Sequence, residues 1–334
     1  MKPILVTGGA GYIGSIVCRL LLERGYEIVV LDNLDEGHRE ALPQKAVFIQ
    51  GDLGDEGLLS RLFGEYSIGA VVHLAASCLV GESVQDPGKY YRNNLGNGLV
   101  LLKVMRAFQV DKLVFSSTAA VYGEPQALPI TETHPTAPLN PYGHSKLVFE
   151  QILEWEEKAY GLKYVAFRYF NAAGAWEGLG EDHRPETHLI PLILRRALRA
   201  KEGKAGDEEV LQVFGGDYAT PDGTCIRDYV HVRDLALAHV LALERLDGLT
   251  ERIFNLGNER GASVLEVIQT AEEVTGCPIP FRIGDRRPGD PAVLVASSGK
   301  AAEVLGWKAR FSDLREIVSS AWEWHQRFPD GYKR

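Results

Sequence analysis

The sequence predicts an α/β fold with a doubly wound parallel sheet and a smaller C-terminal lobe. Two observations lead to this fold class. Short apolar runs alternate with helical patterns through the first half of the chain, and such alternation is typical of parallel strands joined by right-handed crossovers. A glycine-rich segment follows the first apolar run directly, where sheets of this class turn tightly into their first helix.

The expected strands are rich in valine, isoleucine and leucine on both faces, as strands covered by helices on both sides should be. They span residues 4–7, 28–32, 47–50, 70–74 and 113–116. Helical patterns fill three of the intervals between and after them, at residues 12–24, 90–108 and 142–160.

Beyond residue 170 the pattern loosens. Residues 174–185 are rich in glycine, acid and histidine and should form a loop, and the polar residues 201–209 should form an exposed turn. Further helices are expected at 233–245, 264–275 and 314–328, with a strand at 253–256. We therefore expect a domain over 1–170 and a second lobe over 171–334, with the chain returning to the first domain around 228–258.

The composition is that of an ordinary globular protein, with 334 residues of which 45% are hydrophobic and 24% charged. The net charge is −9, and an acidic chain gains nothing from the phosphate backbone of a nucleic acid. We therefore expect no nucleic-acid partner. No apolar run approaches the length of a membrane span, so no membrane partner is expected either.

The cysteines are too sparse for a disulfide framework, and none are paired at the spacing of metal ligands. We therefore expect no metal site. The segment before the first strand is too short to be a signal peptide. Free thiols in the reducing cytoplasm are the expected state of all four, Cys18, Cys78, Cys225 and Cys277.

The glycine-rich segment is the expected site of a dinucleotide. Gly8, Gly11 and Gly14 lie between the first strand and the first helix, where backbone N–H groups and the helix dipole favour a pyrophosphate. Asp32 ends the second strand, 18 positions after Gly14, and its carboxylate would accept from a ribose 2′-hydroxyl and repel a 2′-phosphate. We therefore predict a Rossmann domain that binds NAD rather than NADP, with Asp52 and Leu53 at the adenine edge. A tight turn without ligand is the simpler alternative.

A catalytic pair is expected at Tyr142 and Lys146, which are four residues apart and share one face of a helix. A phenol has a pKa of about 10, and the nearby ammonium and a cationic nicotinamide would lower it toward that of a usable base. Thr118 and Ser116 end the preceding strand, at the edge where this fold binds ligands. Thr118 would bond the substrate oxygen that Tyr142 deprotonates, and Ser116 would help to hold the substrate.

These pieces together resemble the extended short-chain dehydrogenase/reductase family, and within it the UDP-glucose 4-epimerases, over nearly the whole length. The most specific stretch is DGTCIRDYVHV at 222–232. The others are VTGGAGYIG at 6–14, LDN at 31–33, VGESV at 80–84, YYRNN at 90–94, FSSTAAVYG at 115–123, PYGHSK at 141–146, RYFN at 168–171 and RPGD at 287–290.

The resemblance implies a C4 epimerisation of UDP-glucose and UDP-galactose on bound NAD, in a homodimer joined through the helices at 90–108 and 142–160. The second lobe would bind the UDP-sugar, with arginine forks on the diphosphate. Further cofactor contacts are implied for Tyr12, Ile13, Asn33, Leu74, Ala75, Ala76, Asn93 and Tyr169. The implied substrate contacts beyond Tyr142, Thr118 and Ser116 are Asn171, His188, Leu189, Phe214, Arg227, Arg287 and Asp290.

Several positions depart from the patterns of related enzymes. Ala119 and Ala120 stand where dehydratases of this family carry an acidic pair, which favours epimerisation over elimination. Cys78 replaces a lysine that contacts the cofactor in some members, and His188 stands in a segment that is commonly Asn-Asn-Leu. Leu294 occupies the place of a bulky tyrosine, which would admit N-acetylated sugars.

Three alternatives stay open from the sequence. The first is a 4-epimerase of another UDP-sugar, such as a pentose, a uronate or an N-acetylated hexose. A non-catalytic NAD-sensing protein would share the fold, although it would have no need of Thr118, Tyr142 and Lys146. An ordinary dehydrogenase would use the same residues and produce a net change in NADH.

Overall fold

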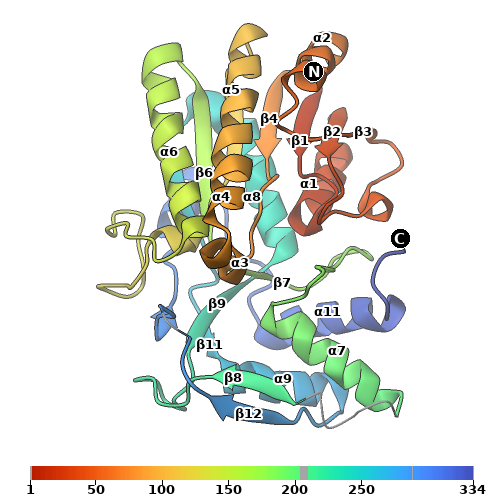
Figure 1. The fold of residues 1–334 in the computed structure, drawn as a ribbon, viewed down its shortest axis with the longest axis vertical. Coiled ribbons are helices and arrows are strands. Elements are labelled where there is room, and N and C mark those ends of the chain that lie inside the picture. The colour runs from red at the N-terminus through yellow and green to blue at the C-terminus, as the bar shows by residue number, and fades with distance from the viewer. Residues whose placement is uncertain (1, 204–209, 288, 334) are drawn as a thin grey trace.

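The computed structural model describes residues 2–203, 210–287 and 289–333. Its central element is a parallel sheet of seven strands in the order β10-β6-β5-β4-β1-β2-β3 (Figure 1). The predicted fold class is confirmed by this sheet. The strands are β1 (Ile4–Thr7), β2 (Ile28–Asp32), β3 (Val47–Gln50), β4 (Ala70–His73), β5 (Lys112–Ser116), β6 (Lys163–Tyr169) and β10 (Ile253–Leu256).

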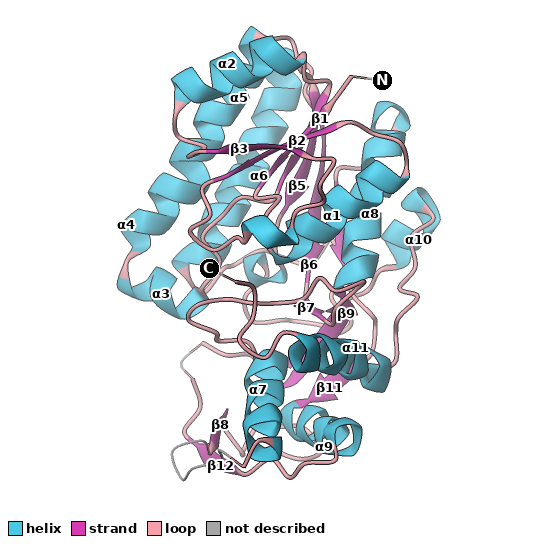
Figure 2. Cartoon of the chain, turned by 90° about the vertical axis from the view of Figure 1, so that its right-hand side faces the viewer, coloured by secondary structure: helices cyan, strands magenta, loops and turns pink. Residues whose placement is uncertain are grey.

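Helices cover both faces of the sheet, which is why its inner strands are apolar throughout. Alternate side chains of β1 enter different cores, with Ile4 and Val6 on one face and Leu5 on the other. The first core is closed by α1 (Tyr12–Glu23) and α8 (Val232–Arg245). The second is closed by α2 (Glu56–Tyr66), α5 (Asn97–Ala107) and α6 (Pro141–Tyr160), and Figure 2 shows the sheet edge-on between the two layers.

The chain passes between the two lobes more than once. β10 pairs with β6 at the edge of the large sheet, with Ile253 opposite Ala166, and α8 packs against α1. Both elements therefore lie in the lobe that carries the glycine-rich turn, although they come late in the sequence. The division at residue 170 with a return around 228–258 stays a prediction.

The second lobe is smaller and lies beyond the carboxyl ends of the large sheet (Figure 1). It contains the short strands β7 (Asn171–Ala173), β9 (Ile226–His231), β11 (Gly261–Ser263) and β13 (Val293–Leu294) in one sheet, and the pair β8 (Leu211–Phe214) and β12 (Phe281–Gly284). Its helices, which share a core with these strands, are α7 (Leu189–Lys201), α9 (Val264–Thr275) and α11 (Leu314–Arg327). The short helix α10 (Gly299–Leu305) instead packs near β10 and α8.

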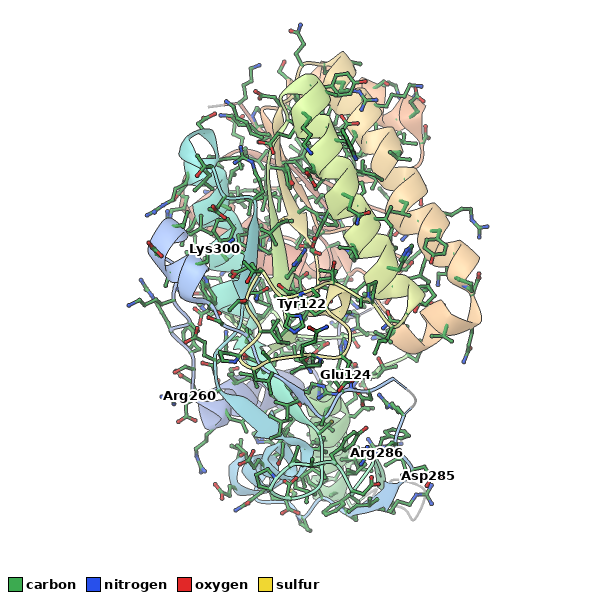
Figure 3. All side chains as sticks on the ribbon, turned by 90° about the vertical axis from the view of Figure 1, so that its left-hand side faces the viewer. Tyr122, Glu124, Arg260, Asp285, Arg286 and Lys300 are labelled. Atoms are coloured by element: carbon green, nitrogen blue, oxygen red, sulfur yellow. The ribbon has the colours of Figure 1, made fainter. Side chains whose placement is uncertain are left out.

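Buried polar bonds tie the loop after β5 to the edge strand β10. The hydroxyl of Tyr122 donates to Asn255 Oδ1 over 2.6 Å, and Asn255 Nδ2 donates to the carbonyl of Ile130 over 2.9 Å. Figure 3 places Tyr122 midway along the molecule, between the large sheet and the second lobe. These bonds hold the loop after β5 in place above the strand ends.

The expected helix at 90–108 is not one continuous α-helix. The chain forms α4 (Pro87–Tyr90), then a π-helical stretch Tyr91–Gly96, then α5. Within that stretch the buried Asn94 accepts from the backbone N–H of Ser77 and donates to the hydroxyl of Ser145. Such tertiary bonds favour the wider turn, and π-helical turns often occur at functional sites.

Several other elements lie where the sequence predicts them. The helices at 264–275 and 314–327 and the strand at 253–256 agree with it to within one residue. Residues 174–185 form a loop, apart from one isolated bridge between Trp176 and Leu179. The expected turn at 201–209 lies largely outside the described residues. Within residues 2–203, 210–287 and 289–333 the helices are too short or too polar to cross a bilayer.

Candidate active site

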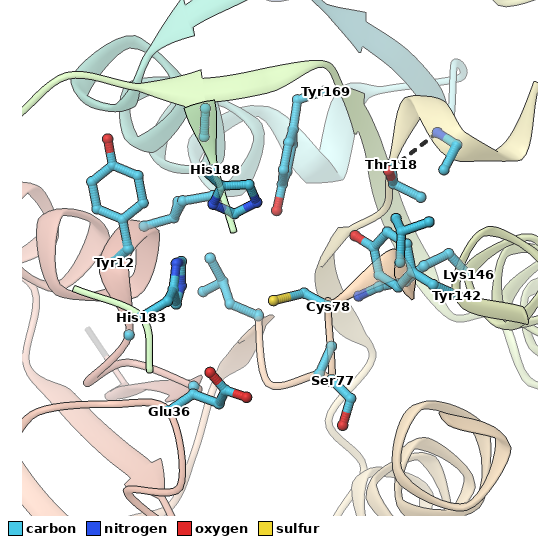
Figure 4. Close-up of a pocket in the computed structure, with 18 of the residues that line it drawn as sticks. Tyr12, Glu36, Ser77, Cys78, Thr118, Tyr142, Lys146, Tyr169, His183 and His188 are labelled. Atoms are coloured by element: carbon cyan, nitrogen blue, oxygen red, sulfur yellow. Dashed lines mark hydrogen bonds between the residues drawn. The ribbon is translucent and has the colours of Figure 1, made fainter. Parts of the chain in front are cut away.

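A cavity of about 830 Å³ lies at the carboxyl edge of the large sheet, between the two lobes. Its walls come from the glycine-rich turn, the ends of β2, β4 and β5, the start of α6, and the second lobe. Ligands bind at this edge in folds of this kind. Figure 4 shows side chains from both lobes pointing into the space.

The glycine-rich turn allows close backbone approach at two positions. Gly8 has φ +71°, and a Cβ there would lie 2.5 Å from the backbone nitrogen of Ala75. A Cβ on Gly14 would lie 2.2 Å from the carbonyl oxygen of Gly8. Helix α1 therefore starts pressed against the turn, with its N-terminal N–H groups and dipole directed at the cavity. Gly8, Gly11, Tyr12, Ile13 and Gly14 all line this wall.

Asp32 lies at the end of β2 and lines the cavity beside Asn33. Its carboxylate accepts from the backbone N–H groups of Ala10 and Leu34, each over 2.9 Å, and burial raises its pKa. Asp35 and Glu36, which no sequence motif indicated, line the same end of the cavity. These carboxylates can accept hydrogen bonds from the two hydroxyls of a ribose and would repel an added 2′-phosphate. The residues present therefore fit NAD.

The remaining cofactor wall contains the predicted Asp52, Leu53, Leu74, Ala75, Ala76, Asn93 and Tyr169. Asn93 Nδ2 donates to Ser77 Oγ over 3.0 Å, which orients its amide. Cys78 also lines the cavity, and burial raises the pKa of its thiol to about 12. Its side chain is therefore neutral, and no cation replaces the lysine found here in some related enzymes.

Tyr142 and Lys146 enter the cavity from the first turns of α6. The helix begins with Pro141 at its first position and with Asn140 as its cap, whose side chain accepts from Gly143 N over 2.8 Å. Lys146 Nζ donates to the carbonyl of Ser116 over 2.8 Å. Burial lowers the pKa of Lys146 to about 8.

The pKa of Tyr142 differs from the sequence expectation. Burial raises it well above the usual value, and a hydrogen bond with Thr118 acts in the opposite direction without overcoming that effect. Lys146 is directed at the backbone of Ser116 and over the ring of Phe115. Within the protein alone, desolvation of the phenol therefore outweighs the attraction of the ammonium.

Ser116, which ends β5, and Thr118, which follows it, have different surroundings. Thr118 lines the cavity, and its Oγ1 accepts from Ala120 N over 3.2 Å. Ser116 does not line the cavity, because its hydroxyl points toward α8 and bonds His239 Nε2 over 3.0 Å. Ser116 therefore lies behind the cavity wall, where it also shares a hydrogen bond with Tyr169 of that wall, and its contact with substrate stays a prediction. Ala119 and Ala120 line the cavity and leave no acid there.

The second lobe supplies the wall opposite the glycine-rich turn, where the sequence predicts substrate contacts. Asn171, His188, Leu189, Arg227, Arg287, Asp290 and Leu294 line the cavity. Phe214 does not; it lies under Arg287, whose guanidinium carbon is 3.9 Å from the ring centroid. Arg227 forms an ion pair with Asp290. Two guanidinium groups at one end of the cavity suit a diphosphate.

Residues that the sequence analysis did not single out also contribute. Glu181 and His183 line the cavity together with the predicted His188, and Figure 4 shows His183 and His188 on the same side of it. Burial alone would raise the pKa of Glu181, but His188 and His183 lower it by charge and hydrogen bonding. The only sequence signal was the acid- and histidine-rich composition of this loop. Ser77, Arg92, Asn97, Leu139, Asn140 and Tyr229 are further lining residues.

Comparison with known proteins agrees with this site. The profile of the NAD dependent epimerase/dehydratase family matches residues 4–257. A protein of Lacticaseibacillus casei named UDP-glucose 4-epimerase is 51% identical, covering 98% of both chains. One of the same name from Halalkalibacterium halodurans is 53% identical, covering 98% of this chain and 97% of its own.

A solved structure agrees as well. The UDP-glucose 4-epimerase of Bifidobacterium longum, in complex with NAD⁺ and UDP, superposes with a TM-score of 0.92 at 42% identity, covering 99% of this chain and 100% of that one. The glycine-rich turn, the Tyr142–Lys146 pair and these similarities have one explanation: the chain belongs to the NAD dependent epimerase/dehydratase family, among its UDP-glucose 4-epimerases.

Proposed function

We propose that this protein interconverts UDP-glucose and UDP-galactose by reversible oxidation and reduction at C4 on bound NAD. The observation that carries the proposal is a single cavity that contains the glycine-rich turn, the Tyr142–Lys146 pair and the Arg227–Arg287 pair. The relatives that share about half of their residues with this chain are named for this reaction. The acid that a dehydratase would need is replaced by Ala119 and Ala120.

NAD, when bound, supplies the hydride acceptor and a positive charge beside the phenol of Tyr142. The chain's own residues move the proton. Tyr142 takes it from the sugar 4-hydroxyl and later returns it to the 4-keto sugar. Thr118, which already bonds the phenol, positions the same oxygen. Lys146, bonded to the Ser116 carbonyl, keeps a positive charge one helical turn from the base.

The sugar must present both faces of C4 to the cofactor, so the enzyme has to hold it loosely. Arg227 and Arg287 would bind the diphosphate, and Asp290 would accept from ribose hydroxyls. Concentrating binding energy on UDP leaves the sugar free to turn over. The small side chains of Ala119 and Ala120 leave room on the cavity wall for that rotation.

Product analysis tests the proposal. Purified protein incubated with UDP-galactose should yield UDP-glucose without a net rise in NADH absorbance, because the cofactor is regenerated in each turnover. A stoichiometric rise in NADH would instead identify an ordinary dehydrogenase. Binding of NAD with no conversion of any UDP-sugar would identify a sensing protein.

Conversion of N-acetylated sugars is a second candidate activity, and Leu294 favours it. This residue lines the substrate end of the cavity, on β13 beside Arg227 of β9. Leucine is smaller than the tyrosine found here in epimerases restricted to non-acetylated sugars. UDP-GlcNAc, a UDP-pentose and a UDP-uronate therefore belong in the same substrate panel, which separates the rival substrates.

We propose a homodimer that pairs through α5 and α6. Large apolar side chains are exposed on these helices and on the π-helical stretch before them, and such patches often mark interfaces. Leu99 is 47% exposed, Trp155 68% and Tyr160 64%. Trp155→Glu should lower the mass measured by light scattering from dimer to monomer, whereas a monomeric parent protein would contradict the proposal.

We also propose that the protein works in the cytoplasm. All four cysteines are free, and three of them are buried. Free thiols persist in reducing compartments. Fractionation of cells that express the native chain, followed by immunodetection, tests this location.

A further inference from the structure

Four potential metal ligands converge on the loop that leads into α7. Glu181, His183, Glu186 and His188 each place one ligand atom within 4.8 Å of the others. Glu181 Oε1 lies 2.5 Å from His188 Nδ1 and 3.1 Å from His183 Nδ1. His188 Nδ1 lies 3.7 Å from Glu186 Oε1. Eight consecutive residues thus supply two imidazoles and two carboxylates to one point.

One of these side chains has a buried polar atom without a hydrogen-bond partner. The clear case is Glu186 Oε2, on a side chain only 2% exposed, whereas His183 Nδ1 lies 3.1 Å from Glu181 Oε1 and shares a hydrogen bond with that carboxylate. Arg195 Nη2 approaches Glu186 Oε2 no closer than 3.6 Å. An unpaired carboxylate oxygen in a buried place is costly. A cation bound by this carboxylate and its three neighbours would satisfy that oxygen.

The ligand set indicates which class of cation fits. Imidazole nitrogen suits zinc and its neighbours among the first-row transition metals, whereas calcium and magnesium prefer all-oxygen sites. A tetrahedral zinc ion with bonds of about 2.0–2.1 Å holds its ligand atoms about 3.3 Å apart. The separations of 2.5, 3.1 and 3.7 Å bracket that value.

We propose that Glu181, His183, Glu186 and His188 bind one divalent transition-metal ion of the zinc class. The site is built entirely from protein ligands, as structural zinc sites are. It lies where the lobes meet: the ring of Tyr12, in the first turn of α1, contacts the ring of His183 edge-on at 6.5 Å. All four ligands come from this loop, so the metal orders the loop beside the first turn of α1.

The neighbouring residue Asp182 is already used in another way. Its carboxylate pairs with Arg184 at 2.9 Å and with Arg195 at 3.1 Å, and its carbonyl accepts from the ring of His38. These contacts direct Asp182 away from the cluster and help to place the loop. The segment that carries the four ligands is thus held in place by the contacts of Asp182 with His38 and Arg195.

Metal content of the whole protein tests the proposal. The protein is dialysed against a chelator, then against excess ZnCl₂, then against metal-free buffer, and zinc is measured by mass spectrometry. Wild-type protein should retain about one zinc per chain. Glu186→Gln and His183→Gln should each reduce the retained zinc by about tenfold or more, because each removes one of four ligands.

Glu177→Gln is the matched control, since Glu177 lies in the same loop but is exposed and pairs with Arg19 at 2.9 Å. It should retain zinc like the wild type. Zinc should also raise the Tm of the wild type and of this control, and not that of the two ligand variants.

An ion-paired His188–Glu181 network that binds no metal is the competing explanation. It predicts wild-type zinc no higher than that of the ligand variants and no rise in Tm, and either result would overturn the proposal. Should the ligand variants misfold, as circular dichroism would reveal, the wild type alone decides. Replacing zinc with Co²⁺ should then produce the visible absorption of a tetrahedral site, and its absence would contradict the assignment.

Discussion

The phenol of Tyr142 shows how strongly one residue depends on its surroundings. Burial raises its pKa, while a hydrogen bond with Thr118 opposes that rise. Lys146, itself buried with a pKa lowered to about 8, lies one helical turn away. The phenol therefore stays protonated in the protein alone, and the positive charge that a bound nicotinamide brings becomes part of its activation.

Replacing that base should stop the chemistry and leave binding intact. Tyr142→Phe should lower the turnover number by about 10²–10⁴-fold, the usual contribution of a general acid–base, with UDP affinity unchanged by calorimetry. Tyr160→Phe is the control, because Tyr160 lies in the same helix and is 64% exposed. Near-normal turnover of the Tyr142 variant would exclude the assigned base.

A single residue should also set the width of the sugar pocket. Leu294→Tyr adds bulk to the substrate end of the cavity, so it should lower kcat/KM for UDP-GlcNAc by about 10- to 100-fold, a size-exclusion effect. The same value for UDP-glucose should change little and serves as the internal control. Equal losses for both sugars would show that Leu294 does not govern selectivity.

At the scale of elements, the contact between α1 and the glycine-rich turn places the cofactor end of the site. Because Gly14 has no side chain, the helix can approach the carbonyl of Gly8. That approach directs the first N–H groups of α1 into the cavity. The start of α1 can lie this close to the glycine-rich turn only because residue 14 has no Cβ.

Gly14→Ala should therefore weaken NAD binding and lower the stability of the fold. A Cβ would lie 2.2 Å from Gly8 O, so the helix must move away, at a cost of about 1–3 kcal/mol. Thermal melts and fluorescence titration with NADH measure the two effects. Gly81→Ala is the matched control: nothing lies within 4 Å of its Cβ, and it is an exposed position in a helix, so it should be neutral or slightly stabilising.

Across the whole molecule, buried neutral histidines should make the fold sensitive to acid. Burial lowers the pKa of His73 to about 3 and those of His231, His239 and His325 to about 4. An unfolded histidine titrates near 6.5. The unfolded chain therefore binds more protons between these values, and stability falls as the pH falls through that window.

The Tm should consequently decrease from pH 6.5 down to about pH 4, in steps that calorimetry at half-unit intervals would follow. Asp228 acts in the opposite direction, since burial raises its pKa to about 6, and burial also raises the pKa of Asp32, Glu186 and Asp234. The four histidines outweigh these carboxyls because their pKa values fall to about 3 or 4. His144→Gln removes an exposed histidine and should leave the acid transition unchanged. A Tm that stays constant down to pH 4.5 would contradict this prediction.

Much of the element order was predictable because its signals are local. The apolar runs of β1, β2 and β3 and the helix at 264–275 agree with the structure residue for residue. β6 and α7 were not predicted. The motif that overlaps the end of β6 obscures its strand pattern, and the loop before α7 obscures the start of its helical pattern. The helix at 90–108 was predicted as regular, and tertiary bonds of Asn94 to Ser77 and Ser145 changed its winding.

The sequence by itself determined the strand–turn–helix with its three glycines, the acid at the end of β2, and a tyrosine and a lysine one helical turn apart. Each of these depends on spacing within a few residues, which backbone geometry converts directly into position. Only the tertiary structure turned Ser116 toward His239, placed Phe214 beneath Arg287, raised the pKa of Tyr142, and gathered the ligand atoms of residues 181–188. Desolvation and side-chain direction depend on atoms far apart in the chain, and no local pattern encodes them.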